Sequence, residues 1–148
     1  LEYKSCQIMP QIFEVDIAPE LSIMGAESEI RSILHTMIIN ACESNSNRAH
    51  PDKHNTVIIN AKNNDKQLTI EVFDQGKGLE SKIENSLFQP HISTKPEGAG
   101  MGLYIAKRII SLHYNGNIFL KNQYLNNGEI VGCLAQADFN ILRITKTG

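Results

Sequence analysis

Residues 68–78 read LTIEVFDQGKG, an alternating apolar run followed by an acidic residue and two glycines. The alternation from Leu68 to Phe73 predicts a strand, and Asp74 with Gly76 and Gly78 is typical of a turn that ends one. A carboxylate beside flexible backbone also suits adenine, because an ionised Asp only accepts hydrogen bonds and the exocyclic amine of adenine donates one. The turn by itself does not decide between a structural and a binding role.

Upstream of this strand, the sequence predicts an amphipathic helix that ends in INACE, residues 39–43. Apolar residues recur at helical spacing between Ile30 and Ala41 and form one face. The run SNSN at residues 44–47 predicts the end of the helix, because these side chains offer the backbone competing hydrogen bonds. Residues three or four apart share a face, so a second, polar stripe contains Thr36, Asn40, Glu43 and Asn47.

Asn40 is the candidate metal ligand on this stripe. Its side-chain carbonyl is a hard oxygen donor of the kind that Mg²⁺ takes together with phosphate oxygens and water. Glu43, one turn further along, would hold a metal-bound water or would simply be solvated. A half-buried structural amide is the competing interpretation of Asn40.

A third glycine-bearing segment opens a second amphipathic helix, predicted over residues 101–113. The sequence GAGMGL at residues 98–103 places three glycines at its start, where unpaired N–H groups and the helix dipole attract phosphate. Thr94 and Lys95 in the preceding loop would contact the terminal phosphate. A nicotinamide fingerprint is disfavoured because it needs its glycines directly after a strand, and a P-loop is excluded because no Gly-Lys-Ser/Thr is present.

The remaining apolar runs predict further strands and an α+β fold. A turn at residues 63–65 joins two of the strands into a hairpin. Residues 80–86 suggest a third, short helix, and residues 87–99 suggest a mobile loop. Mixed helices and hairpins predict one sheet covered on one side by helices. The further strands are expected at residues 12–17, 56–61, 118–120 and 130–139.

Composition narrows the class of protein. A chain of 148 residues with 41% apolar and 20% charged residues is expected to form one globular domain. A net charge of −2 without a basic run argues against a nucleic-acid partner. Three scattered cysteines and five scattered histidines suggest neither a disulfide framework nor a zinc site, and no apolar run reaches the ~20 residues that span a bilayer. The start without Met suggests a piece of a longer protein.

Taken in order, these segments resemble the catalytic ATP-binding domain of sensor histidine kinases. That family lies in the superfamily that also holds gyrase, Hsp90-type chaperones and mismatch-repair ATPases. The resemblance runs over almost the whole chain: residues 33–43 resemble the N box, 74–79 the first glycine box, 87–95 the phenylalanine box and 98–110 the second glycine box. The implied fold is a two-layer sandwich, in which a mixed, mostly antiparallel sheet packs on three helices.

The resemblance also implies a site for ATP and Mg²⁺. Asn40 would hold the metal, and Asn40, Glu43 and Lys95 would be the catalytic residues. Residues 87–102 would form a lid over the phosphates. The nucleotide would be bound by Asn40, Asp74, Gly76, Gly78, Leu79, Thr94, Lys95, Gly98, Gly100, Met101, Gly102 and Leu103.

Two positions depart from the family pattern. Thr36 stands where the family often has a second Asn and where the ATPase relatives have a catalytic Glu. Because a hydroxyl is no general base at neutral pH, this favours phosphate transfer over hydrolysis of the gyrase or chaperone type. His91 replaces an aromatic residue in the phenylalanine box, which would loosen the lid. No segment resembles the helix that carries the acceptor histidine.

The resemblance implies two protein partners. One is a dimerisation and histidine phosphotransfer domain of the same parent protein, whose histidine would accept the γ-phosphate. The other is a downstream response regulator. We expect a cytoplasmic domain that contacts neither nucleic acid nor membrane. Three alternatives stay open: an anti-sigma-type serine kinase, a non-catalytic nucleotide sensor and, least favoured because of Thr36, a clamp ATPase.

Overall fold

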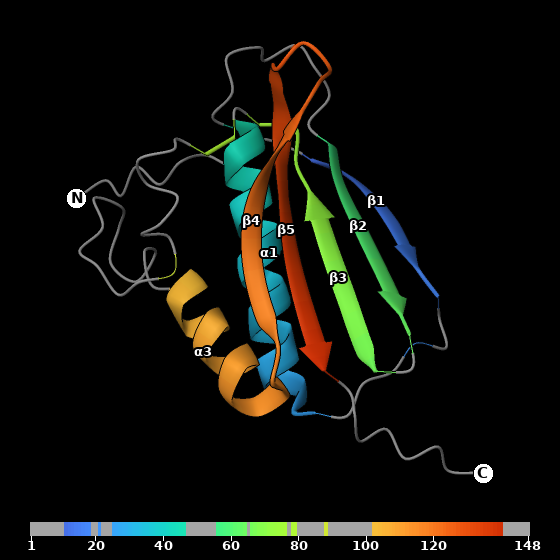
Figure 1. Ribbon diagram of the computed structural model, residues 1–148, viewed down its shortest axis with the longest axis vertical. Helices are drawn as coiled ribbons and strands as arrows, with labels where there is room; N and C mark the ends of the chain where they lie inside the picture. The colour runs from blue at the N-terminus through green and yellow to red at the C-terminus, as the bar shows by residue number, and fades with distance from the viewer. Residues whose placement is uncertain are drawn as a thin grey trace.

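The computed structural model describes residues 11–18, 21, 25–46, 56–64, 66–76, 78–79, 88 and 102–140. Within these residues a five-stranded sheet packs against two helices, α1 (Glu27–Ser46) and α3 (Gly102–Tyr114). Figure 1 shows α1 running along the sheet behind β4 and β5, with α3 beside it. The predicted α+β sandwich is confirmed. The short helix expected at residues 80–86 lies outside the described residues.

The sheet is mixed and mostly antiparallel, as predicted. Its spatial order is β1-β2-β3-β5-β4, in which β1 runs parallel to β2 and every other neighbouring pair is antiparallel. The parallel pair follows from chain length, since α1 provides the long crossover that parallel strands need. The strands are β1 (Ile12–Ile17), β2 (Thr56–Asn63), β3 (Gln67–Phe73), β4 (Asn117–Tyr124) and β5 (Ile130–Asn140).

The hydrophobic core lies between the sheet and the two helices. Alternate residues of β2 to β5 point toward the helices, because successive side chains of a strand face opposite sides, whereas every residue of β1 is exposed. The predicted apolar face of α1 is buried, with Ile33 and Met37 fully covered. On the opposite face of the sheet, polar residues of β2, β3 and β5 line an open cavity of about 320 Å³. The core contains Val57, Ile59, Leu68, Ile70, Val72, Ala106, Ile110, Ile118, Ala135, Ala137 and Phe139.

Helix α1 is longer than the sequence predicts. It continues through Ser44 and Asn45 to Ser46, so the prediction that the SNSN run would stop it was wrong by about one turn. The physical reason is that the Ser44 and Asn45 side chains bond groups on other elements, Asp74 and Thr56 among them. They therefore do not compete for the backbone of their own helix.

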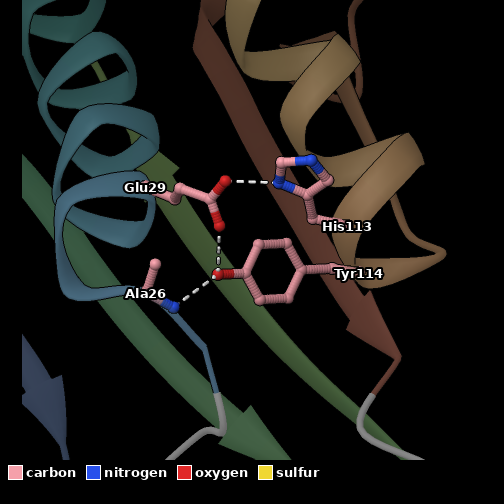
Figure 2. Close-up of polar contacts among 4 residues, drawn as sticks. All are labelled: Ala26, Glu29, His113 and Tyr114. Carbon is pink, nitrogen blue, oxygen red and sulfur yellow. Dashed lines mark hydrogen bonds and ion pairs between the residues drawn. The ribbon is translucent and has the colours of Figure 1, made fainter.

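A cluster of polar contacts joins the start of α1 to the end of α3 (Figure 2). The Tyr114 hydroxyl accepts a hydrogen bond from the Ala26 backbone N–H at 3.1 Å and donates one to the Glu29 carboxylate at 3.0 Å. His113 contacts the other carboxylate oxygen of Glu29. Burial raises the pKa of Tyr114, which keeps the hydroxyl protonated as the donor. The cluster thus caps one of the unpaired N–H groups at the start of α1 and fixes the two helices to each other.

Removing this hydroxyl should loosen the two helices without touching the core. We expect Tyr114→Phe to lower the free energy of unfolding by about 1–2 kcal/mol, because the Ala26 N–H loses its buried partner. Urea unfolding followed by circular dichroism measures the change. Tyr104→Phe, the same substitution on the same helix, is the matched control and should leave stability within about 0.5 kcal/mol of the wild type. Equal effects of the two substitutions would contradict the assigned role.

Candidate functional site

Asp74 follows the last residue of β3 and is held by three donors. Its Oδ1 accepts hydrogen bonds from the Ser44 hydroxyl at 3.1 Å, the Gly76 N–H at 2.9 Å and the Cys133 N–H at 3.1 Å. Burial raises the pKa of Asp74, although these three bonds each lower it. No described residue donates to Oδ2. Asp74 is therefore a half-buried hydrogen-bond acceptor in a fixed position.

The two glycines after Asp74 allow close backbone contacts that no other residue would permit. A Cβ built on Gly76 would lie 2.0 Å from the Ser44 hydroxyl oxygen and 2.6 Å from the Ser44 carbonyl oxygen. Gly78 has a positive φ of 81°, and a Cβ there would lie 2.6 Å from Asn122 Oδ1. Residues 74–76 and 78–79, here called the glycine turn, therefore lie close against α1 at Gly76 and against β4 at Gly78.

Two asparagines hold the backbone of the glycine turn, and sequence reasoning missed both. Asn45, buried in the last turns of α1, accepts the Gln75 N–H on Oδ1 at 2.6 Å. Asn122 on β4 accepts the Leu79 N–H at 2.7 Å and donates to the Leu79 carbonyl at 3.1 Å. The sequence does carry a signal for Asn122, because it is a polar residue at the next inward position after Ile118 and Leu120. Asn45 stood inside a run interpreted only as a helix terminator.

The polar stripe of α1 connects the glycine turn to the start of α3. The stripe also includes Ser44, because Thr36, Asn40 and Ser44 lie four residues apart and share one face of the helix, while the predicted member Asn47 lies outside the described residues. At one end of the stripe, Ser44 bonds Asp74. At the other end, a Cβ on Gly102 would lie 3.3 Å from the Thr36 hydroxyl oxygen, so the first residue of α3 rests on Thr36. Asn40 is half-buried midway along this stripe, whose ends are about 12 Å apart.

Glu43 and Phe88 flank this arrangement. Glu43 is half-buried on α1 beside Cys42, whose thiol pKa is raised by burial and then by the charges of Glu43 and Asp74. Phe88 packs against the core, and the Lys107 Nζ lies 5.3 Å from the centroid of its ring.

The other predicted contacts are divided between described and undescribed parts of the chain. Leu103 is half-buried in the first turn of α3. Some predicted lid and phosphate contacts fall outside the described ranges, so their position relative to Asn40 and Asp74 stays a prediction. These are Thr94, Lys95, Gly98, Gly100 and Met101, together with His91.

In the part of the chain that the structure describes, no group of three or more His, Cys, Asp or Glu side chains is placed to hold a metal ion. A divalent ion at Asn40 would therefore draw most of its ligands from phosphate and water, which is the usual coordination of Mg²⁺. None of the described helices is long and apolar enough to cross a membrane.

Comparison with known proteins places this geometry in a family. Residues 25–136 match the family model described as histidine kinase-, DNA gyrase B-, and HSP90-like ATPase. The sensor protein FixL of Bradyrhizobium diazoefficiens is 30% identical over 128 residues, which are 86% of this chain and 24% of that protein. The histidine kinase AtoS of Escherichia coli is 30% identical over 102 residues, 68% of this chain and 16% of that protein.

Solved structures agree on the fold. The nucleotide-free catalytic domain of the histidine kinase ThkA superposes with a TM-score of 0.72 at 19% identity, covering 88% of this chain and 78% of that chain. The mycobacterial sensor histidine kinase MprB gives a TM-score of 0.69 at 19% identity, covering 87% of this chain and 80% of that chain.

This chain matches only a part of each curated relative. The chain spans between 7% and 26% of the length of the curated relatives described as sensor or sporulation kinases and regulators. The shared part is the region that carries the glycine turn, the stripe of α1 and the start of α3. This chain belongs to the family of histidine kinase-, DNA gyrase B- and HSP90-like ATPases, and within it is homologous to the catalytic ATP-binding domains of sensor histidine kinases.

Proposed function

We propose that this chain binds Mg²⁺-ATP and presents the γ-phosphate to a histidine on a separate dimerisation domain of the same protein. The observation that carries the proposal is the stripe of α1, which joins the half-buried Asp74 at one end to a helix N-terminus at the other. An acid acceptor suits the base of the nucleotide and a helix N-terminus suits its phosphates. ATP would lie along this stripe, with its base at Asp74.

The hydrogen bonds of Asp74 indicate which base the site would accept. Oδ1 of Asp74 is occupied by three protein donors, so Oδ2 is the oxygen that would accept the exocyclic amine of adenine. Guanine has a carbonyl at that position and would leave Oδ2 without a donor in the bound complex, which is costly. The arrangement therefore favours ATP over GTP. Gly76, Gly78 and Leu79 would line the base with backbone.

The phosphate end would combine α3 and the α1 stripe. The unpaired N–H groups at Gly102 and Leu103 would face the phosphates, and Asn40 would offer its side-chain carbonyl to the metal. Bound Mg²⁺ would supply charge neutralisation on the phosphates. Glu43 would orient a metal-bound water, and Thr94 and Lys95 would contact the γ-phosphate. The residues of this domain would position the nucleotide and neutralise the charge of its phosphates, while the nucleophile would come from the partner domain.

The relatives support a signalling partner for the proposed reaction. One solved neighbour is the histidine kinase ThkA in complex with the response regulator TrrA, with a TM-score of 0.67 at 17% identity, covering 87% of this chain and 34% of that chain. A response regulator is therefore the expected final acceptor of the phosphate. Family membership is the basis for proposing both the histidine domain and the response regulator. A cytoplasmic location fits both partners.

The role of Asn40 provides the test of the proposal. We expect Asn40→Ala to reduce ATP affinity about tenfold in excess Mg²⁺ and to leave it unchanged in EDTA, because the lost contact is to the metal and is worth about 1–2 kcal/mol. Isothermal titration calorimetry at several Mg²⁺ concentrations measures this. With the histidine domain of the parent protein added, label from γ-labelled ATP should move to that domain with the wild type and more slowly with Asn40→Ala at the same subsaturating ATP concentration.

His35→Ala, on the exposed side of the same helix, is the matched control and should behave as wild type. A Mg²⁺ response that is the same in Asn40→Ala and in the control would show that Asn40 is a structural amide. Absence of any nucleotide binding by the wild type would refute the proposed function itself.

A further inference from the structure

We infer that Asn122, on β4, is a positioning residue that sets the distance between the two ends of the glycine turn and so shapes the base end of the nucleotide site. The inference rests on the proposed function, and it assigns a role to a residue outside the segments that carried the family resemblance. Its starting point is a polar side chain at a position where the strand pattern calls for an apolar one.

Asn122 stands on the inward side of β4. Ile118 pairs in register with Ala137 and Leu120 with Ala135, and both pairs belong to the core or pack against it. The next inward pair is Asn122 with Cys133. At this position the side chain of Asn122 contacts the main chain of the glycine turn.

The amide of Asn122 matches the backbone that it faces. Its Oδ1 accepts the Leu79 N–H at 2.7 Å, and its Nδ2 donates to the Leu79 carbonyl at 3.1 Å. One side chain thus satisfies both polar groups of one residue, as a neighbouring strand would. Gly78, with its positive φ, brings the turn close enough that a Cβ there would lie 2.6 Å from Asn122 Oδ1. The contact is specific to an amide of this length.

Asn122 and Cys133, which pair across β4 and β5, hold the two ends of the glycine turn side by side. Cys133 holds the start of the turn, because its carbonyl accepts the Asp74 N–H at 2.9 Å and its N–H donates to Asp74 Oδ1 at 3.1 Å. Asn122, directly across from Cys133, holds the end of the turn at Leu79. The separation of Asp74 and Leu79 is therefore set by one cross-strand pair of the sheet, a rigid element.

This geometry gives Asn122 a role in affinity for the base and none at the phosphates. Losing the amide frees the end of the turn, so that Leu79 and Gly78 no longer lie at a fixed distance from Asp74. The binding-competent conformation then becomes one of several, and the apparent affinity falls by the fraction that stays competent. ATP and ADP share the base and should lose affinity by the same factor.

Two variants test the inference in the protein as it exists. We expect Asn122→Ala and Asn122→Val to weaken binding of both ATP and ADP by the same factor, about tenfold, in titration calorimetry. Val keeps the strand propensity of β4, so it serves if the Ala variant folds poorly. The ratio of the two affinities and the Mg²⁺ response should stay as in the wild type. Lys121→Ala, the exposed neighbour on the same strand, is the matched control.

A second readout separates positioning from general stability. Amide hydrogen exchange of Leu79 should become faster in both Asn122 variants and stay slow in Lys121→Ala, while exchange of core amides such as Val72 stays slow in all of them. If the wild type binds nucleotide and both variants bind it equally well, Asn122 has no positioning role. If the wild type binds no nucleotide, the proposed function is wrong, and the inference falls with it.

Discussion

Asp74→Asn should weaken ATP binding by about 10–100-fold, because a charged acceptor, whose hydrogen bond is worth about 1.5–3 kcal/mol, is exchanged for an amide. The three donors on Oδ1 can be kept by the carbonyl oxygen of the new Asn, since Ser44, Gly76 and Cys133 all converge on one atom. The amide nitrogen then takes the place of Oδ2. There it meets the exocyclic amine of adenine as donor against donor.

The same exchange should relax discrimination against GTP. An amide N–H at the former Oδ2 position can donate to the guanine carbonyl that the carboxylate would repel. Calorimetry with ATP and GTP on the variant measures the ratio of affinities, and Asp16→Asn on the exposed strand β1 is the matched control. An unchanged ATP affinity in Asp74→Asn would mean that the base does not bind at this carboxylate.

Although Asp74→Asn should weaken ATP binding, it should not destabilise the ligand-free protein at neutral pH. Burial raises the folded-state pKa of Asp74 above its ordinary value of 3.8, so ionising this group costs free energy in the folded state. That cost is fully present above the folded pKa and vanishes below 3.8. We therefore expect Asp74→Asn to be at least as stable as the wild type at neutral pH, with an advantage that shrinks as the pH falls toward 3.8. A stability loss would point to a structural acid instead of a ligand-binding one.

The main elements of the fold could be predicted from the sequence because the spacing of apolar residues differs between helices and strands. The alternation of β3 and the 3.6-residue spacing of α1 both predicted which residues enter the core, and Val72 and Met37 are indeed buried. Acidic residues at Glu27 and Glu29 lie in the first turn of α1, where the helix dipole favours them. These signals depend only on neighbours in sequence.

The supports of the site were not predictable in the same way, because each joins residues far apart in the chain. Ser44 and Asp74 are separated by thirty positions and Leu79 and Asn122 by forty-three. Nothing in the sequence gives the register that puts Asn122 opposite Cys133. Residue types alone pointed to Asp74 as the candidate acid, while the polar groups that hold it depend on the tertiary arrangement. The same reason explains why the SNSN run was misjudged as a simple helix terminator.

Asn45 is the support whose loss should cost the most stability. Its side chain is 1% exposed and makes three hydrogen bonds. Nδ2 donates to the Gln11 side chain at 2.9 Å and to the Thr56 carbonyl at 3.0 Å, and Oδ1 accepts the Gln75 N–H at 2.6 Å. The last turn of α1 is thereby tied to the starts of β1 and β2 and to the glycine turn. A single amide thus satisfies buried groups from three segments.

We expect Asn45→Ala to lower the free energy of unfolding by about 2–4 kcal/mol, because the Gln75 N–H and the Thr56 carbonyl are left without their partner inside the protein. Urea unfolding measures the loss, and Asn60→Ala on the polar face of β2 is the matched control. Gln75 follows Asp74, so the variant should also bind ATP more weakly, and saturating ATP should raise its Tm by less than it raises that of the wild type at the same ATP concentration. If Asn45→Ala were no less stable than Asn60→Ala, the buried amide would be dispensable and the glycine turn would be held by Ser44, Cys133 and Asn122 alone.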